Sequence, residues 1–302
     1  YIMTSKGVMY VATGERFLEQ AIRSANSLSE NSPNLGSAVV TDHNLIDKVP
    51  EEVFDHVISP EIIRDDVRDK VYNLMMTPFQ WTLYLDCDTH ILADITQLFS
   101  LLERSELAVW PGQNLTLMDD VPDAFREPNA GVILYNRSDE VEKLFDEWVE
   151  LYERQIDGHV FHTKVTDTSA SGLENASSFG IYHDQPTFRK ALYESGLNFV
   201  SLPPEYNFKG TGQRAEHVVK ILHFGDMSKP MREGLITNIN DKDDKVRVKW
   251  RHRLLVSDGS HAALLSKKAE LLYLLASYIK GTKLDLAFEK LGIRHQIKNL
   301  LR

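Results

Sequence analysis

The sequence predicts an α/β protein with a mostly parallel sheet and helices on both of its faces. Short apolar runs alternate along the chain with stretches of helical spacing, a pattern typical of βαβ units. One apolar run, residues 81–85, is followed at once by Asp86 and Asp88. Ligands of such folds bind beyond the carboxyl ends of the strands, so this acidic pair marks a candidate site.

Each element follows from its local pattern. Apolar runs bounded by turn residues predict strands at residues 8–12, 37–41, 56–59, 81–85, 107–110, 131–135, 199–202 and 219–223. Helical spacing predicts helices at residues 17–28, 62–76, 95–104, 140–156 and 184–195. Pro186 falls in the first turn of the last helix, where proline is tolerated. The turn-rich stretches 111–128 and 159–180 are expected to be loops, the first of them near the site.

The composition changes at about residue 261. A leucine-rich stretch that includes Leu264 and Leu265 predicts a helix, and a second helical segment is expected at residues 284–301. We therefore predict a main domain of residues 1–258 and a C-terminal helical segment of residues 259–302. That segment could form an oligomer contact or lie on a membrane surface, but packing on the sheet domain is the favoured interpretation.

Composition limits the possible functions. The 302 residues carry a formal net charge of −10, which argues against nucleic acid as the main partner. Cys87 is the single cysteine, so an intramolecular disulfide and a Cys-based zinc site are both excluded. The sequence shows no signal peptide or membrane-spanning stretch, so we expect a cytoplasmic location, with a secretory lumen left open. The chain begins at Tyr1 and not at methionine, which leaves open an upstream segment.

Asp86 and Asp88 would repel each other at a strand end unless a cation lay between them. Mg²⁺ and Mn²⁺ prefer oxygen ligands and bridge phosphate oxygens, so either ion suits the pair. The alternative is that the two acids only begin a loop or cap the next helix. Cys87 has no obvious base beside it, which favours packing over a nucleophilic role.

Polar residues at other predicted element ends could complete this site. His223 follows an apolar run and offers a nitrogen ligand, and Lys229 could offer its ammonium to a diphosphate. The Asn129 amide can read sugar hydroxyls, as can the Asp184–Gln185 pair at a helix start. Each has an ordinary alternative: a loop histidine, a solvated lysine, a turn before a strand, and a helix cap.

Taken in order, these residues resemble the GT-A glycosyltransferases of the family 8 type, which include glycogenin and bacterial lipopolysaccharide galactosyltransferases. The resemblance covers roughly residues 7–230. It is carried by 10–14, Lys70, 78–89, 129–132, Asp184–Gln185, and His223–Phe224 through Lys229–Pro230. It implies a GT-A fold, a Rossmann-like mixed sheet flanked by helices, with the C-terminal helical segment as an extension.

The resemblance also implies an activity and its residues. Asp86, Asp88 and His223 would bind Mn²⁺, or Mg²⁺, which grips the diphosphate of a UDP-sugar. The nucleotide site would comprise Val11, Ala12, Thr13, Lys70, Asp86, Cys87, Asp88 and Lys229. The catalytic residues would be Asn129, Asp184 and Gln185, which hold the donor sugar. A hexose would pass with retention to a hydroxyl of a carbohydrate or glycoconjugate. Because an amide such as that of Gln185 is a poor nucleophile, a front-face route fits best.

Two departures from the family pattern affect sugar and acceptor identity: Gly225 comes two residues after His223, and Met231 follows Pro230. Two other functions are weighed. In haloacid-dehalogenase-type phosphohydrolases an Asp-x-Asp pair supplies a nucleophile and an acid, but that pair usually lies near the N-terminus. A catalytically silent nucleotide-binding protein would need no intact ligand set.

Overall fold

The computed structural model describes residues 5–60, 62–64, 69–112, 115–118, 120–157, 164–166, 183–209, 214–223, 247–250, 253–257 and 262–265. The chain forms two compact units. The first comprises residues 1–207 with 220–228, and the second residues 208–219 with 229–302. Among the helices of the described part, none has the length and apolar character needed to cross a bilayer.

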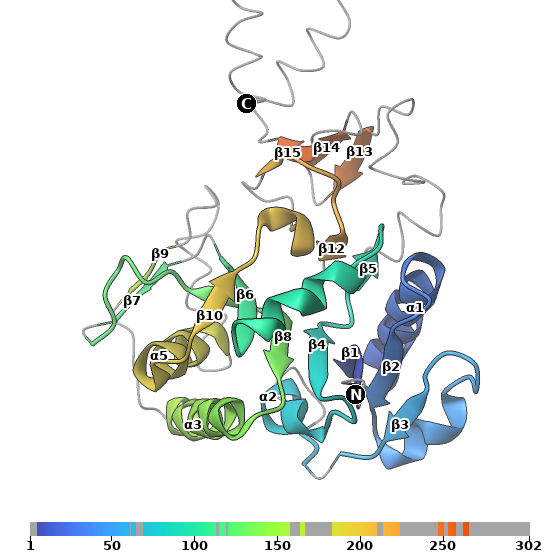
Figure 1. Cartoon of the computed structure of the whole chain (residues 1–302), viewed down its shortest axis with the longest axis horizontal. Helices are drawn as coiled ribbons and strands as arrows, with labels where there is room; N and C mark the ends of the chain where they lie inside the picture. The colour runs from blue at the N-terminus through green and yellow to red at the C-terminus, as the bar shows by residue number, and fades with distance from the viewer. Residues whose placement is uncertain are drawn as a thin grey trace, which may run out of the picture. The chain divides into compact units, whose positions relative to one another are not determined.

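The first unit is built on a seven-stranded sheet with the order β10-β6-β8-β4-β1-β2-β3 (Figure 1). Its strands are β1 (Lys6–Val11), β2 (Gly36–Val40), β3 (His56–Ile58), β4 (Trp81–Leu85), β6 (Leu107–Pro111), β8 (Pro128–Asn136) and β10 (Phe199–Ser201). All run in one direction except β8, which pairs antiparallel with β4 and β6. The predicted fold class, a mixed and mostly parallel sheet, is confirmed.

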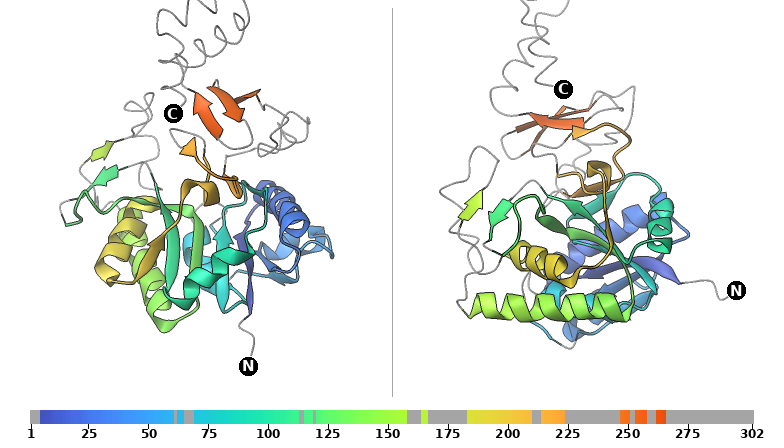
Figure 2. Two further views of the ribbon diagram at one scale, coloured as in Figure 1. Left: turned by 45° about the horizontal axis from the view of Figure 1, so that its top comes forward. Right: turned by 60° about the vertical axis from the view of Figure 1, so that its left-hand side comes forward.

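Helices cover both faces of this sheet (Figure 2). Side chains of β4 alternate between two cores, with Leu83 and Leu85 in one and Tyr84 in the other. The core of Leu83 contains residues of α1 (Glu15–Asn31) and the 3-10 helix η3 (Thr96–Glu103). The opposite core contains residues of α2 (Asp69–Asn73), α3 (Asp139–Ile156) and α5 (Gln185–Ser195). This two-sided burial explains why the central strands are continuous apolar runs.

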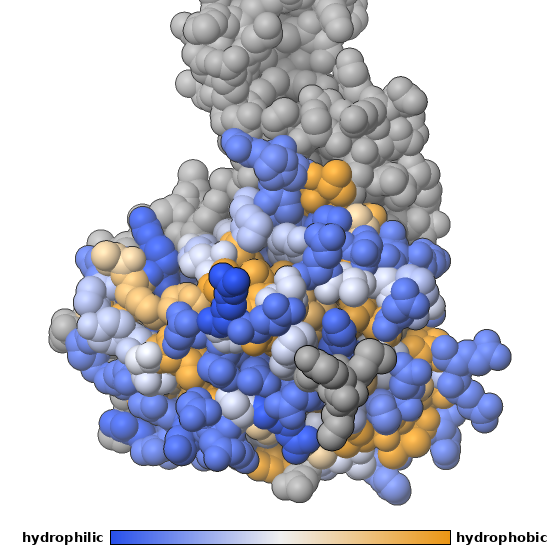
Figure 3. All heavy atoms as spheres, viewed as in Figure 1, coloured by the Kyte–Doolittle hydropathy of each residue, from blue (hydrophilic) through white to orange (hydrophobic). Residues whose placement is uncertain are grey.

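The surface is of the ordinary globular kind. On the face shown in Figure 3, hydrophilic and hydrophobic residues are interspersed over the first unit. Among its described residues, exposed large apolar side chains are few: Val57 of β3, the adjacent pair Ile62 and Ile63, and Tyr193 of α5. Such scattered apolar exposure is normal for a folded domain.

The helix ends have local causes. Ser138 caps α3 by accepting a hydrogen bond from the backbone N–H of Val141, and acidic residues fill the first turn. Pro186 lies in the first turn of α5, as predicted. Gly196 ends α5 in the left-handed conformation, with a φ of 62° that favours glycine.

Several predicted elements differ in the structure. Within the described part of the helix expected at 62–76, residues 69–76 form α2 and the 3-10 turn η2 (Leu74–Met76), whereas residues 62–64 are not helical. The helix expected at 95–104 is the 3-10 helix η3. The expected loops 111–128 and 159–180 contribute strands β7 (Leu115–Leu117) and β9 (Lys164–Thr166), which pair with each other. Pairing between distant segments overrode the local turn signals.

Shorter elements complete the described part of the first unit. Strand β5 (Thr89–Ile91) pairs antiparallel with β12 (Ile221–His223). Two 3-10 turns, η1 (His43–Lys48) and η5 (Pro204–Tyr206), follow β2 and β10. The β5–β12 pair positions the site, because it places the end of β12 opposite the beginning of β5.

The second unit contains a four-stranded antiparallel sheet, β11-β15-β14-β13. Its strands are β11 (Arg214–Ala215), β13 (Arg247–Trp250), β14 (Arg253–Ser257) and β15 (Ala262–Leu265). The prediction that Leu264 and Leu265 begin a helix is wrong: both lie in β15 and pair with β14. A short apolar run cannot be assigned to helix or strand by periodicity alone. The domain division at 258/259 remains a prediction, and the helix expected at 284–301 lies outside the described residues.

Candidate functional site

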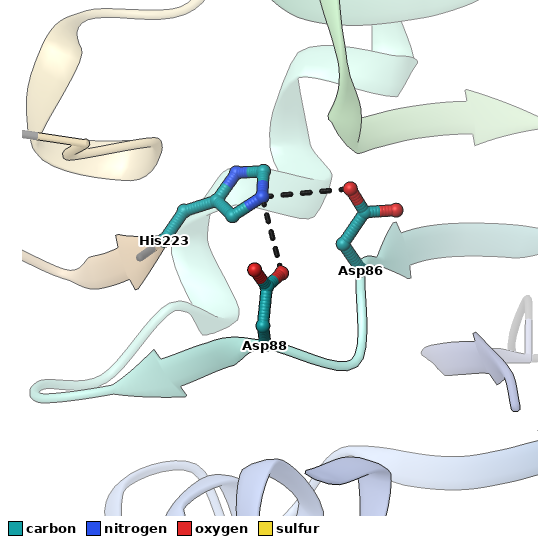
Figure 4. A group of neighbouring side chains, drawn as sticks. All are labelled: Asp86, Asp88 and His223. Atoms are coloured by element: carbon teal, nitrogen blue, oxygen red, sulfur yellow. Dashed lines mark ion pairs between the residues drawn. The ribbon is translucent and has the colours of Figure 1, made fainter. Parts of the chain in front are cut away.

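Two carboxylates and one imidazole converge at the carboxyl end of β4 (Figure 4). Asp86 follows β4, Asp88 precedes β5, and His223 ends β12. Nε2 of His223 lies 3.4 Å from Asp86 Oδ2 and 3.3 Å from Asp88 Oδ1. The imidazole is buried and the two carboxylates are partly exposed, an arrangement that leaves one side open to a ligand. The three predicted metal ligands therefore lie together.

Strand register brings His223 to the acidic pair. In the antiparallel pairing of β5 and β12, His223 lies opposite Thr89, the residue after Asp88. The backbone N–H of Asp86 donates to the carbonyl of Gly131 at 2.8 Å, which extends the β4–β8 pairing to the turn. Because β8 runs antiparallel to β4, its beginning lies beside the end of β4, and Asn129 and Gly131 reach the same edge.

Gly131 makes room for the candidate metal ligands. A Cβ atom at this position would lie 2.0 Å from Cε1 of His223 and 2.6 Å from Oδ2 of Asp86. Any other residue would displace both ligands. Two carboxylate oxygens and one imidazole nitrogen form a donor set that suits a divalent cation such as Mn²⁺. The residues present thus fit a metal site.

Lys70 joins Asp86 to Asp184. Its Nζ atom lies 3.2 Å from Asp86 Oδ1 and 2.8 Å from Asp184 Oδ2. Burial lowers the pKa of Lys70, but the charges of Asp184 and Asp86 outweigh this and hold the pKa above its ordinary value. Lys70 is therefore a fixed positive charge next to the candidate metal site.

Asp86 is held in its ionised form. Burial raises its pKa, but the charge of Lys70 and the interactions with His223 and Tyr84 lower it by more, so the net pKa lies well below the usual value. The Tyr84 hydroxyl donates to Asp86 Oδ1 at 2.8 Å. Deprotonated carboxylates are what a metal requires as ligands.

Asp184 is more than a helix cap. It precedes α5, yet its side chain forms no capping hydrogen bond and pairs with Lys70 instead. Next to it, Oε1 of Gln185 accepts a hydrogen bond from Asn129 Nδ2 at 2.5 Å. Gln185 Nε2 donates to Glu127 Oε1 at 3.1 Å. The structure brings together Asn129, Gln185 and, through Lys70, Asp184, the three residues predicted to hold the sugar.

The residues predicted for the nucleoside lie at the end of β1. Val11, Ala12 and Thr13 are buried, and the Thr13 hydroxyl donates to the Asp69 carboxylate. The neighbouring Gly14 N–H donates to Asp42 Oδ2 at 2.6 Å. Whether these residues bind a nucleotide remains a prediction, and Lys229 lies outside the described residues.

Cys87 points away from the acidic pair. Its thiol is buried and donates to the carbonyl of Val11 at 3.1 Å. Burial, together with the charges of Asp86 and Asp88, raises the pKa of this thiol well above its usual value. A thiol that stays protonated is a poor nucleophile, so the packing role favoured by the sequence agrees with the structure.

Sequence reasoning missed several side chains of this region. Asn207 contacts His223, Glu127 contacts Gln185, and Tyr84 contacts Asp86. Tyr84 lies within the predicted strand, so its hydroxyl gave no distinct signal. Asn207 and Glu127 lie in polar turn segments, where an amide or a carboxylate is unremarkable.

No protein-family model matches the sequence, and no curated protein matches it. Among solved structures, the glycosyltransferase GlyE of Streptococcus pneumoniae TIGR4 is similar, with a TM-score of 0.51 and 18% identity. The match covers 75% of this chain and 56% of GlyE, little more than half of that protein. The galactosyltransferase LgtC, solved with donor and acceptor sugar analogues, matches at a TM-score of 0.49 and 15% identity over 74% of this chain and 88% of its own. The fold is the GT-A glycosyltransferase fold.

Proposed function

We propose that this protein is a metal-dependent glycosyltransferase of the family 8 type that transfers a hexose from a UDP-sugar to a hydroxyl of a carbohydrate or glycoconjugate. The observation that carries the proposal is the convergence of Asp86, Asp88 and His223 around the space that Gly131 leaves free. The GT-A fold supports it, because the acidic pair follows a central strand of the sheet, where α/β folds bind their ligands.

The three ligands would hold Mn²⁺ in preference to Mg²⁺, because an imidazole nitrogen suits Mn²⁺ better than the oxygen-seeking Mg²⁺. The bound ion would neutralise the donor diphosphate and stabilise the negative charge that develops when UDP departs. Lys70 contributes a second positive charge at the same edge, since its ammonium lies 3.2 Å from Asp86. Lys229 is proposed to contact the diphosphate as well.

Retention of anomeric configuration is part of the proposal. Hydrogen bonds on both sides of its amide hold Gln185, and an amide is a poor nucleophile. The Asp184 carboxylate is paired with Lys70. Neither group is therefore well suited to attack the anomeric carbon. We assign both, with Asn129, to positioning sugar hydroxyls, while the leaving phosphate accepts the proton of the acceptor hydroxyl.

Calorimetric titration of UDP with and without Mn²⁺ tests the proposal. Wild-type protein is expected to bind UDP tightly only when Mn²⁺ is present. In Asp88→Ala, adding Mn²⁺ is expected not to strengthen UDP binding. Asp47→Ala is a matched control, because Asp47 is an exposed carboxylate in η1. Screening UDP-sugars for Mn²⁺-dependent hydrolysis then identifies the donor.

Two outcomes would overturn the proposal. Phosphatase activity that needs Asp86 without affinity for UDP would indicate a phosphohydrolase. Metal-dependent UDP binding without turnover of any UDP-sugar or acceptor would indicate a silent nucleotide-binding protein.

A further inference from the structure

Asn207 and His223 form a buried hydrogen bond on the side of the imidazole that faces away from the acidic pair. Nδ1 of His223 lies 2.8 Å from Oδ1 of Asn207, and both residues are buried. Nε2 of the same ring faces Asp86 and Asp88. A metal-ligating histidine commonly donates its other ring N–H to an oxygen acceptor, which fixes the tautomer and the orientation of the ring.

The orientation of the Asn207 amide follows from its hydrogen bond to Asn129. Its Nδ2 atom donates to Oδ1 of Asn129 at 2.9 Å. The same Asn129 oxygen accepts the backbone N–H of Gly131 at 3.2 Å. A backbone N–H can only donate, so the oxygen and not the nitrogen of the Asn129 amide must face Gly131. Asn207 must then turn its nitrogen to Asn129 and its oxygen to His223.

The side-chain amides of Gln185, Asn129 and Asn207 form a hydrogen-bonded series, and its Gln185 end fixes the same donor-to-acceptor direction. Asn129 Nδ2 donates to Gln185 Oε1, and Gln185 Nε2 donates to the Glu127 carboxylate, which accepts when ionised. Gly131 and Glu127 thus fix which amide atom donates and which accepts in each hydrogen bond of the series from Gln185 through Asn129 to Asn207. Reversing Asn129 alone would oppose donor to donor at Gly131 and acceptor to acceptor at Gln185.

We propose that Asn207 is a positioning residue that keeps the proton of His223 on Nδ1 and presents the Nε2 lone pair to the divalent cation. The inference deepens the proposed function and rests on it, because it requires that His223 is a metal ligand. Asn207 is not a catalytic residue, since it acts through the imidazole. Asn129 is its anchor, which links the metal ligand to the residues proposed to hold the sugar.

The test measures Mn²⁺ affinity from the electron paramagnetic resonance signal of the free ion. Asn207→Leu has a similar volume but no acceptor, and it is expected to weaken Mn²⁺ binding about 10- to 100-fold. Asn207→Asp keeps the acceptor oxygen and is expected to bind Mn²⁺ within about threefold of wild type, less than the usual loss for an outer-shell residue. If Asn207 had only a structural role, both variants would be expected to weaken Mn²⁺ binding.

The His223→Ala background tests whether Asn207 acts through the imidazole of His223. Adding Asn207→Leu to His223→Ala is expected to weaken Mn²⁺ binding no further, because the imidazole that Asn207 orients is gone. A further loss equal to that seen in the wild-type background would overturn the inference. Equal Mn²⁺ affinity of wild type and the folded Asn207→Leu variant would do so too.

Nitrogen-15 NMR of the wild-type protein with saturating Mg²⁺ and UDP keeps the test decisive if Asn207→Leu does not fold. The expected result is a proton on Nδ1 of His223, and a proton on Nε2 would overturn the inference. If wild type binds Mn²⁺ but Asn207→Leu binds it equally well, the inference fails and the proposed function stands. If wild type binds no divalent ion, both fail.

Discussion

Lys70 and Asp184 form a partly buried ion pair, with 2.8 Å between Nζ and Oδ2. Lys70 belongs to α2 and Asp184 precedes α5, and the same ammonium also reaches Asp86. The pair thus connects the candidate metal centre to the residues proposed to hold the donor sugar. The single charge of Lys70 is therefore shared by the carboxylates of Asp184 and Asp86.

Lys70→Met removes the cation shared by two carboxylates, so the metal-free variant is expected to lose about 3–5 kcal/mol of unfolding free energy. Urea denaturation measures this loss. Lys70→Arg is the matched control, because it keeps the charge. The double variant Lys70→Met/Asp184→Asn is expected to recover part of the loss, with a coupling of about 0.5–3 kcal/mol. An unfolding free energy unchanged in Lys70→Met would contradict this account.

Gly131→Ala is expected to reduce Mn²⁺ affinity on the order of 100-fold, because its Cβ would overlap His223 and Asp86. Titration of Mn²⁺ against the purified variant checks this. Gly196→Asn provides the control: that position is left-handed, asparagine tolerates it, and a Cβ there meets no atom within 4 Å. Full metal affinity in Gly131→Ala would mean that the three side chains do not form the metal site.

Cys87→Ala is expected to keep the rate of sugar transfer within about threefold of wild type. Removing a nucleophile would instead lower the rate by several orders of magnitude. The thiol is buried and its pKa is raised. We therefore also expect slow alkylation by iodoacetamide in the folded protein and fast alkylation in urea. A variant with less than about a hundredth of the wild-type kcat would place Cys87 among the catalytic residues.

Tyr72, outside the candidate site, is expected to make the free energy of unfolding fall at alkaline pH. Partial burial, followed by its hydrogen bond to Glu153, raises the pKa of Tyr72 to about 12. A pKa raised in the folded state contributes stability that is present below the unfolded value of 10.0 and is lost as the pH rises toward the folded value. The stability difference between wild type and Tyr72→Phe is therefore expected to shrink from about pH 10 to pH 12.

Urea denaturation of both proteins at several pH values measures that difference. Glu15→Gln serves as the control, because Glu15 pairs with Lys48 on the exposed surface and involves no tyrosine. A difference between wild type and Tyr72→Phe that stays constant over this range would show that the pKa of Tyr72 is not raised.

Much of the fold was predictable where local pattern and burial agree. The apolar runs of β1, β4 and β8 and the amphipathic helix α3 were recognised within a few residues of their bounds. Short or ambiguous stretches were not. Residues 262–265 form a strand because β14 pairs with them, and the β7–β9 pairing lies in segments that read as loops. Such pairings depend on partners far away in the sequence.

The residues of the candidate site likewise divide into those that the sequence could predict and those that it could not. Asp86, Asp88, His223, Asn129 and Gln185 could be proposed from residue type and position at element ends. Asn207 could not, because nothing near it in the chain distinguishes a structural amide from one that contacts the candidate ligand His223. Its role depends on the position of His223, which a different strand supplies.

By itself, the sequence determined the alternation of strands and helices, the strand that ends in two carboxylates, and the residue types available to bind a cation. Those features arise from local periodicity, turn chemistry and charge. Only the tertiary structure decided that β8 runs against its neighbours, that Gly131 opens the space beside His223, and that Lys70 joins Asp86 to Asp184. The physical reason is that strand direction, register and buried polar pairing depend on contacts between distant segments, and local sequence carries little record of them.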